Sequence, residues 1–389
     1  MNVSSRKTPL PKNRYIIDEI RSALKEKMVF LGGPRQVGKT SLCRHLLGAE
    51  PGDDHPGYLN WDIREHRAAI LRGDLPTKEP LIVLDEIHKF ARWRQLVKGL
   101  FDRFHPKMQV LVTGSARLDH YRKGGDSLVG RYRYFRLHPY SLPELRQHHD
   151  SRSLKDLLNF SGFPDPLMAR DEKAWRIWQR DRVSLVIRDD LQDLERVMEV
   201  TLLEMLMEAL PNKVGSPLSL QSLREDLQVS HDSIRKWLQI FENLYLTYRI
   251  SPYGAPRIRA VKKEQKLYFW DWTQAEEPGP RLENLVASHL LKYCNFLEDT
   301  EGWKMELRFI RDTDKREVDF VVLQNRKPLF AVECKTGEKL VSKSAIYFRE
   351  RTPIPKFYQV HMGSRDFGDE SIDVRVLPLE TFLKIETLE

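Results

Sequence analysis

Residues 33–40 read GPRQVGKT, and this stretch decides the fold of the N-terminal part of the chain. It satisfies the pattern G-x-x-x-x-G-K-[ST], with an apolar run before it and a helical pattern after it. Glycine lets the backbone curl closely around phosphate oxygens, so that its N–H groups point at the phosphate. The helix that follows adds the partial positive charge of its N-terminus. The stretch therefore predicts a phosphate-binding loop and not merely a tight turn.

The residues of this loop have distinct expected roles. We expect Lys39 to reach the β- and γ-phosphates of ATP and Thr40 to offer its hydroxyl to Mg²⁺. The rest of the loop is expected to line the same nucleotide site: Gly33, Pro34, Arg35, Gln36, Val37, Gly38 and Ser41. The sequence thus predicts ATP and Mg²⁺ as ligands.

The surrounding sequence alternates between two kinds of pattern up to about residue 140. Four apolar runs are expected to be strands: 27–33, 56–62, 80–87 and 108–116. Helical patterns lie between them, most clearly at 40–48 and 93–104. Strands interleaved with helices predict right-handed βαβ units and a parallel sheet.

Two acidic residues, Asp85 and Glu86, end the apolar run LIVL. Ligands of open α/β sheets bind at the carboxyl ends of the strands, so this pair is expected at the ATP site. We expect Asp85 to hold the magnesium-bound water and Glu86 to polarise the attacking water. An exposed acidic pair without a function is the competing interpretation.

Two further residues are candidates for contacts with the γ-phosphate. Ser115 follows another apolar run and either senses the γ-phosphate or is an ordinary strand-end hydroxyl. Arg131 follows Gly130 and is a candidate arginine finger, acting in its own site or in a neighbour's. Arg133 and Arg136 are alternates, and a solvated basic strand is the competing interpretation.

Residues 215–253 have another rhythm, two short helices joined by QVSHDS and followed by an apolar strand, which predicts a helix-turn-helix with a wing. Ser230 or Asp232 is the expected N-cap of the second helix. Its buried face is expected to contain Ile234, Trp237, Leu238 and Phe241, and its outer face His231, Arg235 and Lys236. A basic strip follows: Arg257, Arg259, Lys262, Lys263 and Lys266. Contacts with DNA phosphates are one interpretation, and protein contacts within an assembly are the other.

Near the C-terminus, residues 317–335 read EVDFVVLQNRKPLFAVECK. Asp319 and Glu333 lie in two predicted strands, and Lys335 shares a strand face with Glu333. Carboxylates inside apolar strands are costly unless they bind something. We expect a Mg²⁺ site in which Asp319 and Glu333 are ligands and Lys335 stabilises negative charge, with Glu283 contributing from the preceding helix. An inactive scaffold that holds DNA or other domains is the alternative.

Several of these stretches carry a resemblance to known families. FLGGPRQVGKTSL, LIVLDEIHKF, VLVTGSARLD, GDSLVGR and LHPYSLPEL resemble the AAA-type ATPases that carry a C-terminal DUF4143 domain. EVDFVV and AVECK are similar to the PD-(D/E)xK nuclease fold. The first resemblance implies Walker A, Walker B, sensor and finger roles for Lys39, Thr40, Asp85, Glu86, Ser115 and Arg131. It also implies an ATP site completed across a subunit interface.

These patterns predict a P-loop AAA-type ATPase domain with a parallel sheet (1–145), a helical region (146–213), a winged-helix-like domain (214–273) and a small α/β restriction-nuclease-like domain (281–389), with a linker at 274–280. The chain has 389 residues, and its net charge of +8 suits a polyanionic partner. Three widely spaced cysteines, no apolar run near 18 residues and no apolar segment typical of a signal peptide predict a cytoplasmic protein without a membrane span.

The function we expect from the sequence is ATP hydrolysis coupled to work on DNA. That work is remodelling of, or translocation on, branched or duplex DNA, with or without cleavage by the C-terminal site. A homo-oligomer is expected, a ring among its forms. The alternatives are a nucleotide-controlled signalling or defence switch and a protein remodeller, each with an inactive nuclease scaffold.

Overall fold

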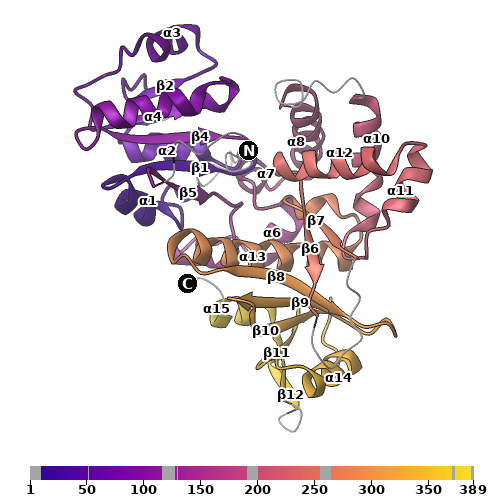
Figure 1. Ribbon diagram of the computed structural model, residues 1–389. Coiled ribbons are helices and arrows are strands. Elements are labelled where there is room, and N and C mark those ends of the chain that lie inside the picture. The colour runs from indigo at the N-terminus through magenta and orange to yellow at the C-terminus, as the bar shows by residue number, and fades with distance from the viewer. Residues whose placement is uncertain are drawn as a thin grey trace, which may run out of the picture.

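The computed structural model describes residues 10–50, 52–115, 128, 130–190, 200–254, 264–369 and 373–386. Along the chain they form an N-terminal parallel sheet, a group of helices and a C-terminal mixed sheet (Figure 1). Within these ranges, no helix is long and apolar enough to cross a membrane.

The N-terminal sheet has five parallel strands in the order β2-β3-β4-β1-β5. The strands are β1 (Met28–Gly32), β2 (Tyr58–Asn60), β3 (Leu81–Asp85), β4 (Gln109–Gly114) and β5 (Tyr132–Arg136). The helices around them are α1 (Ile17–Leu24), α2 (Lys39–Leu47), α3 (Arg64–Arg72), η1 (Ile87–Lys89) and α4 (Trp93–Phe104).

Both faces of this sheet are covered, which explains why its central strands read as continuous apolar runs. Val29 and Leu31 of β1 enter one hydrophobic core, and Met28 and Phe30 enter a second core on the other face. All residues of β1 and of β3 are buried. The predicted parallel α/β sheet is confirmed.

A group of helices follows β5. It contains α5 (Leu142–Gln147), α6 (Leu154–Phe160), α7 (Pro164–Ala169), α8 (Glu172–Leu185), the π-helix η2 (Val186–Asp190), α10 (Val200–Ala209), η3 (Pro211–Lys213), α11 (Leu220–Leu227) and α12 (His231–Asn243). Most of their buried apolar side chains belong to a hydrophobic core that also contains one face of the C-terminal sheet. The helices and that sheet therefore pack as one unit.

Helix α12 agrees in detail with its sequence pattern. Of the two candidate N-caps, Ser230 takes the position, and its side chain accepts a hydrogen bond from the backbone N–H of Ser233. The predicted inner face is buried, namely Ile234, Trp237, Leu238 and Phe241. On the outer face, Arg235 forms an ion pair with Asp232 of the same helix.

The C-terminal sheet has eight strands in the order β12-β13-β11-β10-β9-β8-β6-β7. Its elements are β6 (Thr247–Pro252), β7 (Lys266–Phe269), η4 (Trp272–Gln274), α13 (Pro278–Thr300), β8 (Met305–Arg311), β9 (Glu317–Gln324), β10 (Lys327–Cys334), α14 (Lys343–Arg351), β11 (Phe357–His361), β12 (Phe367–Asp369), β13 (Val374–Pro378) and α15 (Leu379–Glu386).

The strands predicted for a wing are part of this larger sheet. β6 and β7 pair antiparallel, as a wing would, but β6 also pairs parallel with β8 through Ser251 and Arg308. An isolated two-stranded pair is marginally stable, and pairing with β8 satisfies its edge. The expected linker at 274–280 is also not extended, because η4 ends at Gln274, Ala275 is fully buried and α13 begins at Pro278.

Helix α13 lies between the two sheets (Figure 1) and packs against both β5 and β8. Its polar residues on the side of the N-terminal sheet make specific contacts. The backbone N–H of Arg136 on β5 donates to Asp299 at 2.9 Å, and the Arg136 guanidinium pairs with Asp299 and Glu298. Asn295 lies 3.0 Å from the His138 ring. The helix thus ties the end of β5 to the C-terminal sheet.

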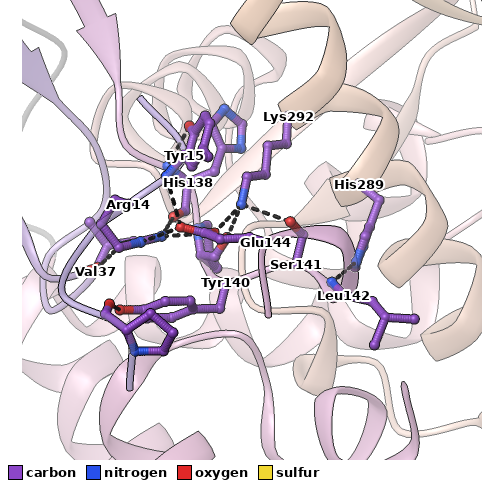
Figure 2. A network of polar contacts seen from close by, with 12 residues as sticks. Arg14, Tyr15, Val37, His138, Tyr140, Ser141, Leu142, Glu144, His289 and Lys292 are labelled. Atoms are coloured by element: carbon purple, nitrogen blue, oxygen red, sulfur yellow. Dashed lines mark hydrogen bonds and ion pairs between the residues drawn. The ribbon is translucent and has the colours of Figure 1, made fainter. Parts of the chain in front are cut away.

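A buried ionic network completes this junction (Figure 2). Glu144 lies between two cations: Arg14 Nε donates to it at 2.6 Å, and the ammonium of Lys292 on α13 contacts its other oxygen. All three residues are less than 5% exposed. Burial alone would raise the pKa of Glu144, but the charges of Arg14 and Lys292 outweigh it and lower the pKa to about 2.

We predict that Glu144→Gln strongly destabilises the fold. Removing one partner of a buried ionic group leaves the others uncompensated, at a cost of about 3–5 kcal/mol. The melting temperature should fall by roughly 10 °C, since about 1 kcal/mol shifts a domain of this size by ~2–4 °C. The matched control is Glu172→Gln, because the Arg176–Glu172 pair is exposed. That variant should shift melting by no more than ~2 °C.

The same network predicts a pH dependence. The folded pKa of Glu144 is depressed to about 2, so its stabilisation is present at neutral pH and is lost as the pH falls toward that value. Melting temperatures measured from pH 5 to pH 3 should therefore fall more steeply for the wild type than for Glu144→Gln. Parallel curves would contradict the assignment.

Candidate functional site

The loop between β1 and α2 has the backbone conformation that its glycines predict. Gly33 has φ 150° and Gly38 has φ 101°, and Gly38 caps α2, which begins at Lys39. A Cβ atom on Gly33 would lie 2.5 Å from the carbonyl oxygen of Leu137. The loop therefore needs glycine at residue 33 both for its dihedral angle and for its close approach to a neighbouring segment.

Lys39 is almost completely buried within this loop. Its ammonium donates to the carbonyl oxygens of Gly33 and Pro34, each at 2.8 Å. These carbonyl partners are neutral, and a phosphate oxygen would make a stronger, charge-assisted hydrogen bond with the ammonium. The geometry therefore suits the predicted role of Lys39 at the β- and γ-phosphates.

Thr40 and Asp85 meet across the gap between α2 and β3. The Thr40 hydroxyl donates to Asp85 Oδ2 at 3.0 Å, and the hydroxyls of Tyr58 and Thr113 also donate to the Asp85 carboxylate. Asp85 is thereby held at the carboxyl end of a buried strand, beside an exposed threonine. A hydroxyl and a carboxylate are the protein groups that a phosphate-bound Mg²⁺ uses in such sites, so these residues fit the ion.

Glu86 comes next and has left-handed backbone dihedrals, with φ 57°. Its carboxylate accepts a hydrogen bond from Ser115 at 3.4 Å and lies 3.5 Å from the His88 ring. Burial lowers the pKa of His88 to about 4, helped by the charges of Lys89 and Lys39. The ring is therefore neutral near pH 7 and does not form a charged pair with Glu86.

Two arginines from outside the motif contact the phosphate loop, and sequence patterns did not single them out. Arg14 donates to the carbonyl of Val37 at 3.1 Å (Figure 2), and Arg182 of α8 donates to the carbonyl of Arg35 at 3.5 Å. Arg182 also lies over the Phe163 ring, with 4.3 Å between its guanidinium carbon and the ring centroid. Neither arginine belongs to a recognisable spacing, so only the fold brings them to the loop.

Arg131 lies just before the N-terminal end of β5, whereas the phosphate loop follows the C-terminal end of the neighbouring strand β1. In the parallel register of β1 and β5, Gly32 pairs with Arg136, and the N–H of Met28 donates to the carbonyl of Arg131. Five residues of strand separate Arg131 from Arg136, about 16 Å at 3.3 Å per residue. Arg131 pairs with Asp102 at 2.8 Å. This placement contradicts a finger role in its own ATP site, and a role in a neighbour's site stays a prediction.

The C-terminal motif residues do come together. The pairing of Val332 with Phe320 continues the register so that Glu333 lies opposite Asp319. Asp319 accepts a hydrogen bond from the backbone N–H of Cys334 at 2.8 Å, and Lys335 pairs with Glu333 at 2.6 Å. Burial raises the pKa of Glu333, and the charge of Asp319 raises it further.

Lys266 corrects the prediction of an exposed basic strip. Its side chain is fully buried, and its ammonium lies 2.5 Å from Glu317, 3.1 Å from Glu283 and 3.6 Å from Asp319. Lys266 is the first residue of β7, and its side chain lies on the buried face of that strand. The other members of the strip, Arg257, Arg259, Lys262 and Lys263, lie outside the described residues.

Glu283 joins this acidic cluster from α13, as expected, but its partners are not those of a metal ligand. It accepts from the Tyr268 hydroxyl at 2.7 Å and from Lys266. Within the described ranges, no group of three or more His, Cys, Asp or Glu side chains could hold a metal ion. The Mg²⁺ site at Asp319 and Glu333 stays a prediction, with Lys266 beside Asp319.

Comparison with known families agrees with the two ends of the chain. Residues 25–146 match the family described as AAA domain, and residues 278–382 match the domain of unknown function DUF4143. The chain therefore joins an AAA domain to a C-terminal DUF4143 domain. This confirms the resemblance to AAA-type ATPases with a C-terminal DUF4143 domain, and the likeness to the PD-(D/E)xK nuclease fold stays a prediction. The segment between them, residues 151–273, matches the domain of unknown function DUF8612.

The relatives of this AAA protein include two uncharacterized proteins. One, from Haemophilus influenzae, is 22% identical and covers 81% of this chain and 84% of its own length. MJ1637 of Methanocaldococcus jannaschii is 23% identical, over 90% of this chain and 87% of its own length. In both cases the similarity extends over most of both chains.

Solved structures with some likeness have low scores. The Holliday junction branch migration motor RuvB of Thermotoga maritima is 16% identical with a TM-score of 0.30, over 60% of this chain and 88% of that chain. The STAND protein PH0952 of Pyrococcus horikoshii is 14% identical with a TM-score of 0.24, over 77% of this chain and 50% of that chain. At these scores the assignment of the AAA domain rests on the family match and the sheet.

We predict that Gly33→Ala weakens ATP binding about tenfold or more. The added Cβ meets the backbone of Leu137, and the loop must adopt a strained conformation, which costs about 1–3 kcal/mol. Isothermal titration with a non-hydrolysable ATP analogue measures the loss. The control is Gly99→Ala in α4, where a Cβ meets nothing within 4 Å. It should leave ATP affinity unchanged and raise stability by roughly 0.5–1 kcal/mol; equal effects of the two substitutions would contradict the assignment.

Proposed function

We propose that this protein binds ATP with Mg²⁺ at its AAA domain and hydrolyses it, and that a homo-oligomer uses the hydrolysis to act on DNA. The observation that carries the hydrolysis is the arrangement of four residues at one edge of the sheet. Lys39 and Thr40 begin α2, Asp85 ends β3 and Glu86 follows it, and Thr40 and Asp85 are hydrogen-bonded to one another.

In this proposal the phosphate loop and Lys39 hold the β- and γ-phosphates. Thr40 and Asp85 would hold Mg²⁺, which neutralises charge that develops on the phosphate oxygens. Glu86 orients the attacking water and accepts its proton, and Ser115 fixes the Glu86 carboxylate by hydrogen bonding. The His88 ring beside Glu86 is neutral, so it carries no charge that would compete for the proton-accepting carboxylate.

We predict that Glu86→Gln lowers ATP turnover by about 10²–10⁴-fold, because the water loses its base. ATP affinity should change little, since the amide keeps the shape of the side chain. Phosphate release gives turnover, and titration with a fluorescent ATP analogue gives affinity. Glu65→Gln, on the exposed first turn of α3, is the control and should hydrolyse ATP as the wild type does. Wild-type turnover by Glu86→Gln would place the base elsewhere.

Support for DNA as the partner comes from charge. The net charge is +8, and α12 exposes Arg235 and Lys236. If these residues contact phosphates, binding must weaken steeply with salt. We predict at least a tenfold loss of DNA affinity between 50 and 200 mM NaCl, with a smaller salt slope for the double variant Arg235→Ala, Lys236→Ala. Anisotropy with labelled duplex, single-stranded and four-way-junction DNA measures both. A flat affinity over this range would rule out a phosphate-contacting surface.

A nucleotide-controlled switch is the second candidate, and the junction between the sheets favours it. Arg14 contacts both the phosphate loop and Glu144, and Glu144 contacts α13 through Lys292. A change of the loop on ATP binding would therefore reach the C-terminal part of the chain. ATP turnover measured with and without DNA separates the two candidates: strong stimulation by one DNA form supports a DNA-dependent motor, and slow turnover indifferent to DNA supports the switch.

A further inference from the structure

We propose that the ammonium of Lys266 is the built-in cation of the C-terminal acidic cluster, in the place that a divalent metal takes in a metal-dependent nuclease. The acidic cluster consists of Glu283, Glu317, Asp319 and Glu333. On this proposal the DUF4143 domain is stable without a metal ion and has no metal-dependent cleavage centre.

The carboxylates around Lys266 are arranged as the ligands of a metal ion would be. Carboxylates from two elements converge on one nitrogen atom: Glu283 from α13, and Glu317 and Asp319 from alternate positions of β9, which share a strand face. The distances to Lys266 Nζ are 3.1, 2.5 and 3.6 Å. A metal site of a nuclease-like fold is expected to have one carboxylate from a helix and others from a strand around a metal ion. Here the same kinds of carboxylate surround an ammonium group.

Strand pairing and burial leave the Lys266 side chain no route to solvent. The residue is fully buried and begins β7, where its backbone pairs with Ile250 on one side and Pro217 on the other. Its ammonium lies 5.6 Å from the Phe309 ring centroid. Because strand pairing fixes the direction of the side chain, the ammonium cannot reach solvent unless this part of the sheet unpacks.

The segment before α11 also covers the cluster. Gly215 has φ 73°, and a Cβ there would lie 2.7 Å from Glu283 Oε2. The Tyr268 hydroxyl donates to the other Glu283 oxygen. The carboxylate that a metal would need from α13 is therefore already contacted from several sides.

The charges of the cluster nearly balance. Its four carboxylates face three cations, since Arg311 pairs with Glu317, Lys335 pairs with Glu333, and Lys266 pairs with Glu283 and Asp319 as well as with Glu317. A divalent ion adds two positive charges to carboxylates that are nearly neutralised. It could bind only if Lys266 left, and a buried ammonium without its partners is strongly disfavoured.

The first test uses the wild-type chain. Mn²⁺ is titrated into the nucleotide-free protein and followed by electron paramagnetic resonance, for the wild type and for Asp319→Asn. We expect the same number of bound ions and the same affinities in both proteins, because any Mn²⁺ at the phosphate loop is common to them. A sub-millimolar site that is present in the wild type and lost in Asp319→Asn would overturn the proposal.

The second test removes the ammonium of Lys266 from the acidic cluster. Lys266→Met keeps an unbranched side chain one atom shorter and removes its charge, so the carboxylates should then bind Mn²⁺. We expect a lower melting temperature than wild type without metal, and a recovery of roughly 5–10 °C at a Mn²⁺ concentration one hundred times the dissociation constant. The double variant Lys266→Met, Asp319→Asn should lose much of this recovery.

Lys292→Met is the matched control, because Lys292 is also a buried lysine paired with a carboxylate. It should be destabilised and should gain no more from Mn²⁺ than the wild type does, since any Mn²⁺ at the phosphate loop is common to both. A melting temperature of Lys266→Met that stays low at every Mn²⁺ concentration would overturn the claim that the ammonium takes the metal's place. If Lys266→Met does not fold even with Mn²⁺, the wild-type titration decides the question.

Discussion

The carboxylate of Glu144 holds together three segments that are far apart in the sequence. It accepts hydrogen bonds from Arg14 before α1 and from Lys292 in the middle of α13, and all three groups are buried (Figure 2). Isolated charges cannot be buried at this depth, so each of the three depends on the other two. The position of α13 against the N-terminal sheet, and with it that of the C-terminal sheet, follows from this contact.

The same contact reaches the ATP site. Arg14 also donates to the carbonyl of Val37, and Arg182 donates to that of Arg35, so two guanidinium groups hold the outer side of the phosphate loop. Any movement of the loop must either break these hydrogen bonds or carry the arginines with it. Since Arg14 is tied to Glu144, the second outcome moves the junction with α13. In the proposed switch, coupling between the nucleotide and the C-terminal domain would therefore depend on a few buried charges.

Much of the fold could be predicted from the sequence because its signals are local. The phosphate loop, the strands on either side of it and the Asp85–Glu86 pair each occupy a short stretch with a distinctive spacing. The N-cap Ser230 and the buried face of α12 are local for the same reason. Their chemistry is set by neighbours three or four residues away.

The errors concern residues whose environment is made by distant segments. Arg14 and Lys292 carry no pattern, since their shared partner Glu144 is more than a hundred residues from either. Arg131 follows a motif-like glycine, but strand register places it at the wrong edge for its own site. Lys266 stands in a basic run that suggests an exposed surface, although β7 turns it inward.

Two buried lysines show how one chemical group can serve a ligand site or close one. Lys39 donates hydrogen bonds to two carbonyl oxygens of a loop that begins and ends in glycine, and a phosphate oxygen would give its ammonium a charge-assisted hydrogen bond. Lys266 is held by three carboxylates under paired strands, so a cation that displaced it would have to leave a buried ammonium without partners. The surroundings of the two lysines therefore differ, although the chemical group is the same. For this reason we assign the chemistry of the chain to the phosphate loop and a structural role to the acidic cluster.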